Sequence, residues 1–263
     1  MYASNQIARG SEGGVYKAVV KIKKSPEAAR TEYRMQRMCA GRYVWPVDLV
    51  GNMIVMPPAD MDLFSFSVLH KGAIDPRVGW RLIRHVSTAL FEIHRRNMVH
   101  RDIKLENILI DLNGDDGPVA RVSDFGFAAT IQPGESLTER LGTLTYIAPE
   151  IEAGKPYGQK VDMWSFGVVV YTVVTGYKPF DPRGPSGASS GRGLSYSGLK
   201  RWREATLSDA QRDAVTRTLR EDPLKRASSK YVLKLKLLGA AAAPKAEAEP
   251  EAGLGIGLTA SGA

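Results

Sequence analysis

Residues 100–109 read HRDIKLENIL, and residues 123–127 read SDFGF. In the first string, Asp102 can accept a proton from an attacking hydroxyl, and Lys104 can offset charge on a moving phosphoryl group. Asn107 and Asp124 offer oxygen ligands of the kind that a small hard cation takes. Phosphoryl transfer depends mainly on electrostatic positioning, and these residue types provide it. The two strings therefore predict a site that positions a nucleotide phosphate and its magnesium.

The two strings, in this order, resemble the catalytic segments of the eukaryotic-type protein kinases. Lysine two residues after Asp102, together with GTLTYIAPE at 142–150, is similar to serine/threonine rather than tyrosine kinases. The resemblance extends from about Ile7 to Leu238. It implies an α+β, bilobal fold with a small β-rich N-lobe that holds one helix and a larger, mostly α-helical C-lobe. It also implies ATP and Mg²⁺ as cofactors and protein substrates.

The expected catalytic domain spans residues 1–238, with the N-lobe at about 1–58 and the C-lobe at about 59–238. Residues 239–263, rich in Ala, Gly, Glu and Pro, are expected to form a disordered, low-complexity tail. Residues 181–198, rich in Gly, Ser and Pro, are expected to form a loop, as is the turn-forming run at 113–118.

Bulk composition favours an intracellular protein, located in the cytoplasm or nucleus. The chain of 263 residues has one cysteine, which excludes an intrachain disulfide and fits a reducing compartment. No N-terminal run resembles a signal peptide, and the longest apolar stretch, Phe166 to Val174, is too short to span a bilayer. No membrane partner is expected.

The formal net charge of +8 could attract anionic partners such as nucleic acid. The basic residues are scattered and are not interleaved with aromatic residues, so a solvated surface is favoured and nucleic acid is not expected as a partner. The oligomeric state is left open.

Secondary-structure signals divide the chain. Strand-like runs are expected within Ile7–Lys24, at Val47–Val50 and at Met53–Met56. A helix is predicted between the first and second of these runs, because Ser25 can cap its start, Pro26 suits its first position and Gly41 follows its end. On this helix Ala28, Glu32, Met35 and Cys39 share the inward face. Later helices are indicated by the stripe Leu82, Val86, Leu90 (or Ala89) and Ile93, and by the segments Val161–Thr175, Ala210–Leu219 and Lys230–Leu238.

The string IARGSEGGVYKA resembles the kinase glycine loop, with Gly10, Gly13 and Val15 in matching places. Glycine lets the backbone approach phosphate oxygens because it has no Cβ. Ala8 and Glu12 depart from the family pattern, and an acidic loop tip is expected to weaken nucleotide binding.

The string AVVK at 18–21 resembles the family's VAIK strand, which makes Lys21 the lysine for the α- and β-phosphates and Glu32 its ion-pair partner. The spacings around Lys21 are shorter than in most kinases, so Lys23 and Lys17 are alternatives. Gln36, one turn beyond Glu32, stands where the family usually has an apolar residue between the lobes.

The string Met56-Pro57-Pro58-Ala59 resembles the hinge between kinase lobes. By this resemblance the carbonyl of Pro57 accepts from the adenine amino group, and the N–H of Ala59 meets the ring nitrogen. Proline lacks only the N–H, so both groups are intact.

The resemblance assigns roles to other residues of the C-lobe. Thr143 is expected to hydrogen-bond near Asp102 and Lys104. Glu150 is expected to pair with Arg226, and Asp162 to brace the backbone of the HRD string.

Arg101 precedes Asp102, an arrangement that in this family accompanies control by a phosphate on the activation segment. Glu139 stands three residues before Gly142, where such a phosphate often lies. We hypothesise that Glu139 supplies a permanent negative charge to Arg101; a solvated loop carboxylate is the alternative.

Three further interpretations concern substrate and class. Glu106 and Asp62 favour a basic residue just before the target hydroxyl. Asp62 can also hold the ribose, and it can equally be a helix cap. The compact first lobe and GSEGGVY are also similar to serine/threonine kinases of herpesviruses or other large DNA viruses. Alternatives to a protein kinase are a pseudokinase scaffold with little catalysis, a small-molecule kinase of similar fold, and a nucleic-acid-binding protein.

Overall fold

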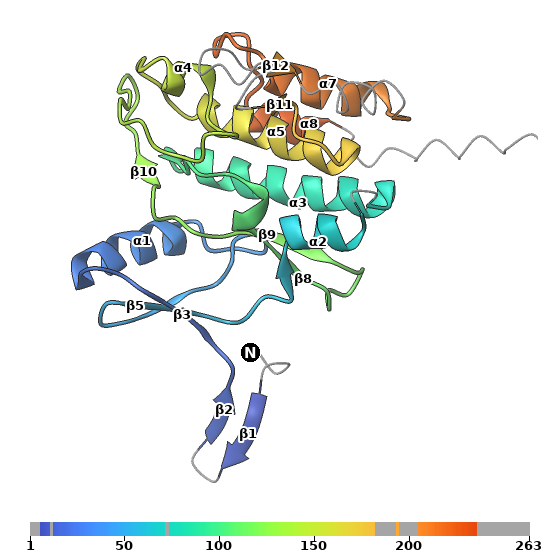
Figure 1. Ribbon diagram of the computed structural model, residues 1–263. Coiled ribbons are helices and arrows are strands. Elements are labelled where there is room, and N and C mark those ends of the chain that lie inside the picture. Colours follow the sequence, from blue (N-terminus) through green and yellow to red (C-terminus); the bar gives the residue numbers. More distant parts are fainter. Residues whose placement is uncertain (1–5, 11–12, 72–73, 182–192, 195–204, 236–263) are drawn as a thin grey trace, which may run out of the picture.

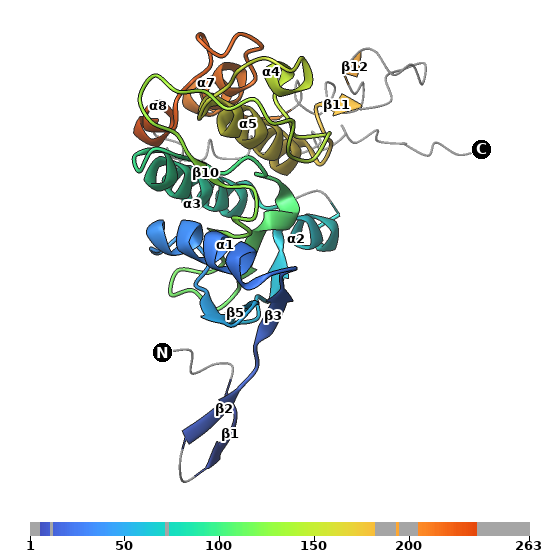
Figure 2. The same cartoon turned by 90° about the vertical axis from the view of Figure 1, so that its left-hand side faces the viewer.

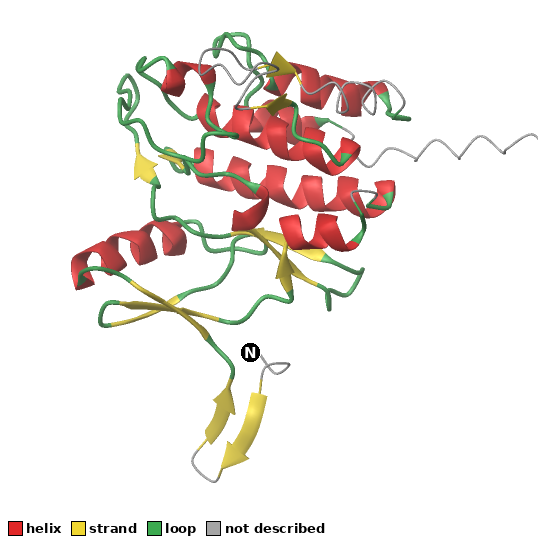
Figure 3. Cartoon of the chain, viewed as in Figure 1, coloured by secondary structure: helices red, strands yellow, loops and turns green. Residues whose placement is uncertain are grey.

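The computed structural model describes residues 6–10, 13–71, 74–181, 193–194 and 205–235. A small sheet-containing region with one helix is followed along the chain by a larger helical region (Figure 3). The fold is therefore the expected bilobal α+β fold, and residues 57–60 join the last strand of the first region to the next strand of the chain. Within the described residues, no helix is both long and apolar enough to cross a bilayer.

The N-terminal region is built on an antiparallel sheet with the order β3-β5-β4. Strands β4 (Asp48–Val50) and β5 (Met53–Met56) form a hairpin, and β3 (Val19–Ile22) pairs with β5. Helix α1 (Pro26–Met38) begins where Ser25 Oγ accepts a hydrogen bond of 3.2 Å from Ala28 N. Ala29 of α1 packs with Val47 and Ile54 in a small core between helix and sheet.

Strands β1 (Gln6–Gly10) and β2 (Gly13–Tyr16) pair with each other as a separate two-stranded sheet. Figures 1 and 2 show this hairpin extending away from the β3-β5-β4 sheet. Glycine-loop residues therefore lie on a hairpin that projects from the body of the fold.

The buried face of α1 overlaps the one expected from the sequence but is centred on different residues. Ala29, Glu32 and Gln36 are buried on it, whereas Ala28 and Met35 are only half-buried; Cys39, just after the helix, is buried as expected. Gln36 can be buried because its amide Nε2 donates to the carbonyl oxygen of Trp45 at 2.8 Å. Apolar spacing did not predict Gln36 on this face because the partner of Gln36 comes from outside the helix.

Helix α5 (Lys160–Thr175) lies at the centre of the C-terminal region, between α3 (Pro76–His94) and α7 (Asp209–Thr218) (Figure 1). Nearly all residues of α5 are buried, as its apolar sequence predicts. The predicted stripe of α3 is also buried. The remaining helices are α2 (Leu63–Leu69), α4 (Pro149–Glu152) and α8 (Ser229–Lys234).

Short strands between the two regions position the polar residues of the HRDIKLENIL and SDFGF strings. Strands β6 (Met61–Asp62), β8 (Ile108–Asp111) and β9 (Val119–Val122) form a sheet in the order β6-β8-β9. The 3-10 turn η2 (Leu105–Asn107) leads into β8, and Asp124 follows β9 by two residues. The turn-rich segment 113–118 joins β8 to β9 as expected.

Two further pairs of short strands complete the described fold. Strand β7 (Met98–Val99) pairs with β10 (Ala129–Thr130), and β11 (Phe180–Asp181) pairs with β12 (Gly193–Leu194). Most of the loop expected at 181–198 and the tail expected at 239–263 lie outside the described residues.

Candidate active site

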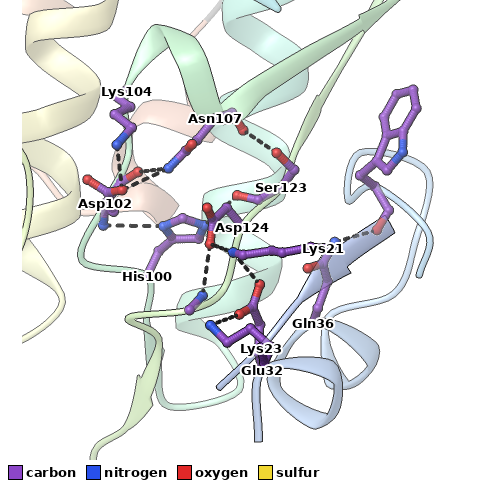
Figure 4. Close-up of polar contacts among 12 residues, drawn as sticks. Lys21, Lys23, Glu32, Gln36, His100, Asp102, Lys104, Asn107, Ser123 and Asp124 are labelled. Carbon is purple, nitrogen blue, oxygen red and sulfur yellow. Dashed lines mark hydrogen bonds and ion pairs between the residues drawn. The ribbon is translucent and has the colours of Figure 1, made fainter. Parts of the chain in front are cut away.

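The carboxylate of Asp102 is held by the side chains of Lys104, Asn107 and Thr143, the first two of which are drawn in Figure 4. Oδ2 of Asp102 lies 2.8 Å from Lys104 Nζ and accepts a hydrogen bond of 2.9 Å from Asn107 Nδ2. Oδ1 accepts a hydrogen bond of 2.9 Å from the hydroxyl of Thr143, which itself accepts from Lys104 Nζ at 3.0 Å. Asp102 is buried with 8% of its surface exposed, so these donors fix the direction of a largely desolvated charge.

The backbone before Asp102 is held by hydrogen bonds to Asp162 of α5. Oδ2 of Asp162 accepts from His100 N and Oδ1 accepts from Arg101 N, both at 2.8 Å. Arg101 has φ 69°, a left-handed conformation that non-glycine residues rarely adopt. The two bonds to Asp162 therefore stabilise a strained turn at the catalytic segment, and the bracing role expected for Asp162 is confirmed.

Lys21 joins the N-terminal region to the site. Its Nζ lies 2.8 Å from Glu32 Oε1 and 2.7 Å from Asp124 Oδ1, so it bridges a residue of α1 and the residue after β9 (Figure 4). Lys23 contacts the other oxygen of Glu32, Oε2, at 2.7 Å. Lys17 has an exposed side chain. Of the three lysines considered, Lys21 is the one that also reaches Asp124.

The charges of this cluster favour its ionised state. Burial alone lowers the pKa of Lys21, but the hydrogen bonds and negative charges of Asp124 and Glu32 outweigh it and raise that pKa overall. Burial alone raises the pKa of Asp124, but the hydrogen bond and charge of Lys21 outweigh it and lower that pKa overall. Asp124 is therefore a carboxylate at neutral pH.

Asn107 and Asp124 have oxygen atoms suited to a magnesium ion. Asn107 donates from its amide nitrogen to Asp102, which leaves its side-chain oxygen as the acceptor. Asp124 Oδ1 accepts from Lys21 Nζ and from Gly126 N, at 3.2 Å for the latter. A carboxylate with an amide oxygen is the kind of partial ligand set that Mg²⁺ completes with phosphate and water.

Gly126 keeps the space beside this carboxylate open. A Cβ at position 126 would lie 3.1 Å from Asp124 Oδ1 and 3.2 Å from Glu32 Oε2. A side chain there would press on both acidic groups, which explains glycine in the SDFGF string.

The hinge string carries a contact that sequence reasoning missed. Nε1 of Trp45 donates to the carbonyl oxygen of Pro57 at 3.0 Å, so this expected adenine acceptor already has one partner. A carbonyl oxygen has a second lone pair for a ligand. Because Trp45 also accepts from Gln36, a polar chain runs from α1 to Pro57. No local pattern around Trp45 indicates this link, since its partners lie in distant segments.

The structure does not bring every predicted binding residue together. Gly10, Gly13 and Val15 lie in the projecting β1–β2 hairpin, with Gly10 opposite Gly13 and Ala8 opposite Val15. Ala59 follows Pro57 and Pro58 at the junction between β5 and β6.

Two ion pairs fix the segment that follows Asp124. Nη1 of Arg101 lies 2.6 Å from Glu139 Oε2. Arg226 donates to both oxygens of Glu150, at 2.6 and 2.8 Å, with both side chains buried. The expected pair of Glu150 and Arg226 is thus confirmed, and it anchors the AlaProGlu string to the start of α8.

Comparison with known proteins agrees with this geometry. The family model described as the protein kinase domain matches residues 42–238, more than half of the chain. Lys21 and Glu32 lie before the matched range, and Lys21 nevertheless contacts Asp124 inside it.

Three relatives illustrate the similarity. The liver/testis isoform of the phosphorylase b kinase gamma catalytic chain of Bos taurus is 34% identical over 181 residues, which are 66% of this chain and 43% of that protein. Serine/threonine-protein kinase RAD53 of Saccharomyces cerevisiae is 34% identical over 193 residues, 65% of this chain and 22% of that protein. Protein kinase kin1 of Schizosaccharomyces pombe is 31% identical over 207 residues, 78% of this chain and 22% of that protein.

The chain spans less than half the length of these relatives. The family match, the bilobal fold and the arrangement around Asp102 and Asp124 agree with one another. The chain belongs to the eukaryotic-type serine/threonine protein kinase family.

Proposed function

We propose that this protein transfers the γ-phosphoryl group of ATP to serine or threonine hydroxyls of protein substrates. The observation that carries the proposal is the Asp102 carboxylate, held by Lys104, Asn107 and Thr143 within 2.8–2.9 Å. A carboxylate in this position can orient a hydroxyl and accept its proton.

The other side chains act on the phosphates. Lys104 would offset charge on the transferring group, a role supported by the position of its ammonium beside Asp102. Lys21 would hold the α- and β-phosphates once its ammonium turns from Asp124; its contacts with Glu32 and Asp124 support this role. Asn107 and Asp124 would hold Mg²⁺, which neutralises charge on the phosphates when it is bound.

We also propose that substrates with a basic residue just before the target hydroxyl are favoured. Glu106 supports this, because it lies exposed on η2, between Lys104 and Asn107. Asp62 contributes less to the proposal, since its Oδ1 caps α2 by accepting from Ser65 N at 2.7 Å. Replacing upstream arginines by alanine in arrayed peptides is expected to slow phosphorylation; equal rates would remove this preference.

A location inside the cell, in the cytoplasm or nucleus, is part of the same proposal. It is supported by the single, buried thiol of Cys39 and by the ATP that the activity consumes.

Two measurements on the purified protein test the activity. Mg·ATP is expected to raise the melting temperature, and γ-³²P-labelled ATP is expected to label a generic basic protein substrate. Nucleotide binding without label transfer would favour a pseudokinase scaffold. If the protein neither binds nucleotide nor transfers label, the whole proposal is contradicted.

A further inference from the structure

Glu32 binds two lysines instead of one. Its side chain is 3% exposed, and its oxygens are divided between Lys21, at Oε1, and Lys23, at Oε2. A carboxylate this deeply buried requires a partner for each oxygen, since an unpaired buried oxygen is costly. The second oxygen of Glu32 therefore depends on Lys23 (Figure 4).

The backbone of Lys23 is fixed in a way that aims its side chain at Glu32. Its N–H donates to the carbonyl oxygen of Asn52 at 2.9 Å, and its own carbonyl accepts from Asn52 Nδ2 at 3.0 Å. Along the strand, Lys21 and Lys23 point to the same side, whereas Ile22 between them is 71% exposed. The turn that holds Asn52 thus continues the geometry of β3 for one more residue.

The two lysines have different second partners. Lys21 is shared between Glu32 and Asp124, whereas Glu32 is the carboxylate that Lys23 contacts. The four groups together balance two negative and two positive charges. Without the ammonium group of Lys23, Lys21 alone would have to neutralise the carboxylates of Glu32 and Asp124.

We propose that Lys23 is a positioning residue for the nucleotide site. It holds Oε2 of Glu32 so that Oε1 stays directed at Lys21, and it balances the charge of Glu32 when Lys21 turns from Asp124 toward phosphate. This inference rests on the proposed function, because the phosphate contact of Lys21 is part of it.

Substitution of Lys23 tests the division of labour between the lysines. Lys23→Met is expected to raise KM for ATP about tenfold and to change kcat by less than about twofold. The reason is that the variant loses the half-buried pair with Glu32, which orients Lys21 for binding. Lys23→Arg is expected to restore KM to within about threefold because it keeps the charge. Lys24→Met, at the exposed neighbouring position, is the matched control and is expected to leave both constants unchanged.

A second background shows whether Lys23 acts through Glu32. In protein carrying Glu32→Gln, the further change Lys23→Met is expected to alter KM less than about twofold, since no carboxylate remains to be held. An unchanged KM in the single variant would overturn the proposal, and so would an equal tenfold rise in the Glu32→Gln background.

Calorimetry separates this inference from the proposed function. The Kd of Mg·ATP measured on the same variants is expected to follow the same pattern, whether or not the protein transfers phosphate. Absence of transfer by the parent would count against the proposed activity alone. A Kd that is unaffected by Lys23→Met would count against the role of Lys23 alone.

Discussion

Arg101 and Glu139 form an ion pair that links the residue before Asp102 to the segment after Asp124. Nη1 of Arg101 lies 2.6 Å from Oε2 of Glu139, and Nε of Arg101 donates to the carbonyl oxygen of Phe127 at 2.5 Å. The Arg101 side chain is 7% exposed and that of Glu139 is 60% exposed. Glu139 therefore lies against Arg101, the contact that the sequence analysis predicted for it.

Protein made in bacteria and treated with phosphatase is therefore expected to be active. Glu139→Gln is expected to lower kcat/KM about two- to fivefold, since a pair whose carboxylate is 60% exposed contributes at most about 1 kcal/mol. Thr138→Ala is the control and is expected to change the rate little. A requirement for phosphate on Thr138 would contradict this account of Glu139.

The buried pair of Glu150 and Arg226 is expected to dominate the stability of the C-terminal region. Glu150→Gln leaves a buried guanidinium without its bidentate partner and is expected to reduce the free energy of unfolding by about 3–5 kcal/mol. Urea denaturation measures the change. The control is Arg217→Gln, which breaks the exposed pair with Asp213 and is expected to cost less than about 1 kcal/mol. Equal losses in the two variants would contradict the account.

Gly142 is expected to tolerate no side chain. It has φ +111°, and a Cβ there would lie 2.8 Å from the carbonyl oxygen of Arg101. Gly142→Ala is expected to lower kcat on the order of tenfold to a hundredfold, because it displaces the residue next to Asp102. Gly134 has φ +89° and open space around its Cβ position, so Gly134→Ala is the control that carries only the backbone strain. A normal kcat for Gly142→Ala would show that this contact is not needed.

The stability of the protein is expected to fall as His85 is forced to take up a proton. The pKa of His85 is lowered from 6.5 to about 4. Burial is the largest cause, and the positive charges of four nearby arginines add to it: Arg81, Arg42, Arg84 and Arg121. Between these two values the unfolded chain binds a proton that the folded chain does not. His85 therefore contributes stability that is present above pH 6.5 and is lost as the pH falls toward 4, by at most about 1.4 kcal/mol per pH unit.

The free energy of unfolding, measured in urea at about pH 7 and about pH 5, tests this dependence. His85→Gln cannot take up the proton and is expected to lose at least about 1 kcal/mol less than the parent over that range. A parallel loss in parent and variant would assign the acid sensitivity to other groups.

Local patterns predicted the parts of the fold that depend on local spacing. The stripe of α3 and the all-round apolar sequence of α5 were sufficient because burial repeats with the helical period. Asp102, Lys104 and Asn107 lie within six residues, so one short string specifies their relationship.

Long-range contacts determined what the sequence did not show. The inward face of α1 depends on the carbonyl of Trp45, and strands of two residues such as β6 and β7 have no period to detect. Lys21 and Lys23 share a strand face, so alternation alone cannot rank them. Only the position of Asp124, more than a hundred residues later, distinguishes Lys21.

The most direct test of the central claim is label transfer from γ-³²P-ATP by the purified parent and by Asp102→Asn, in parallel with the Kd of Mg·ATP for both. Because the amide cannot accept the hydroxyl proton, the variant is expected to bind nucleotide normally and to label substrate about 10²- to 10⁴-fold more slowly. Equal labelling rates for parent and variant would contradict the assignment of Asp102 as the catalytic carboxylate.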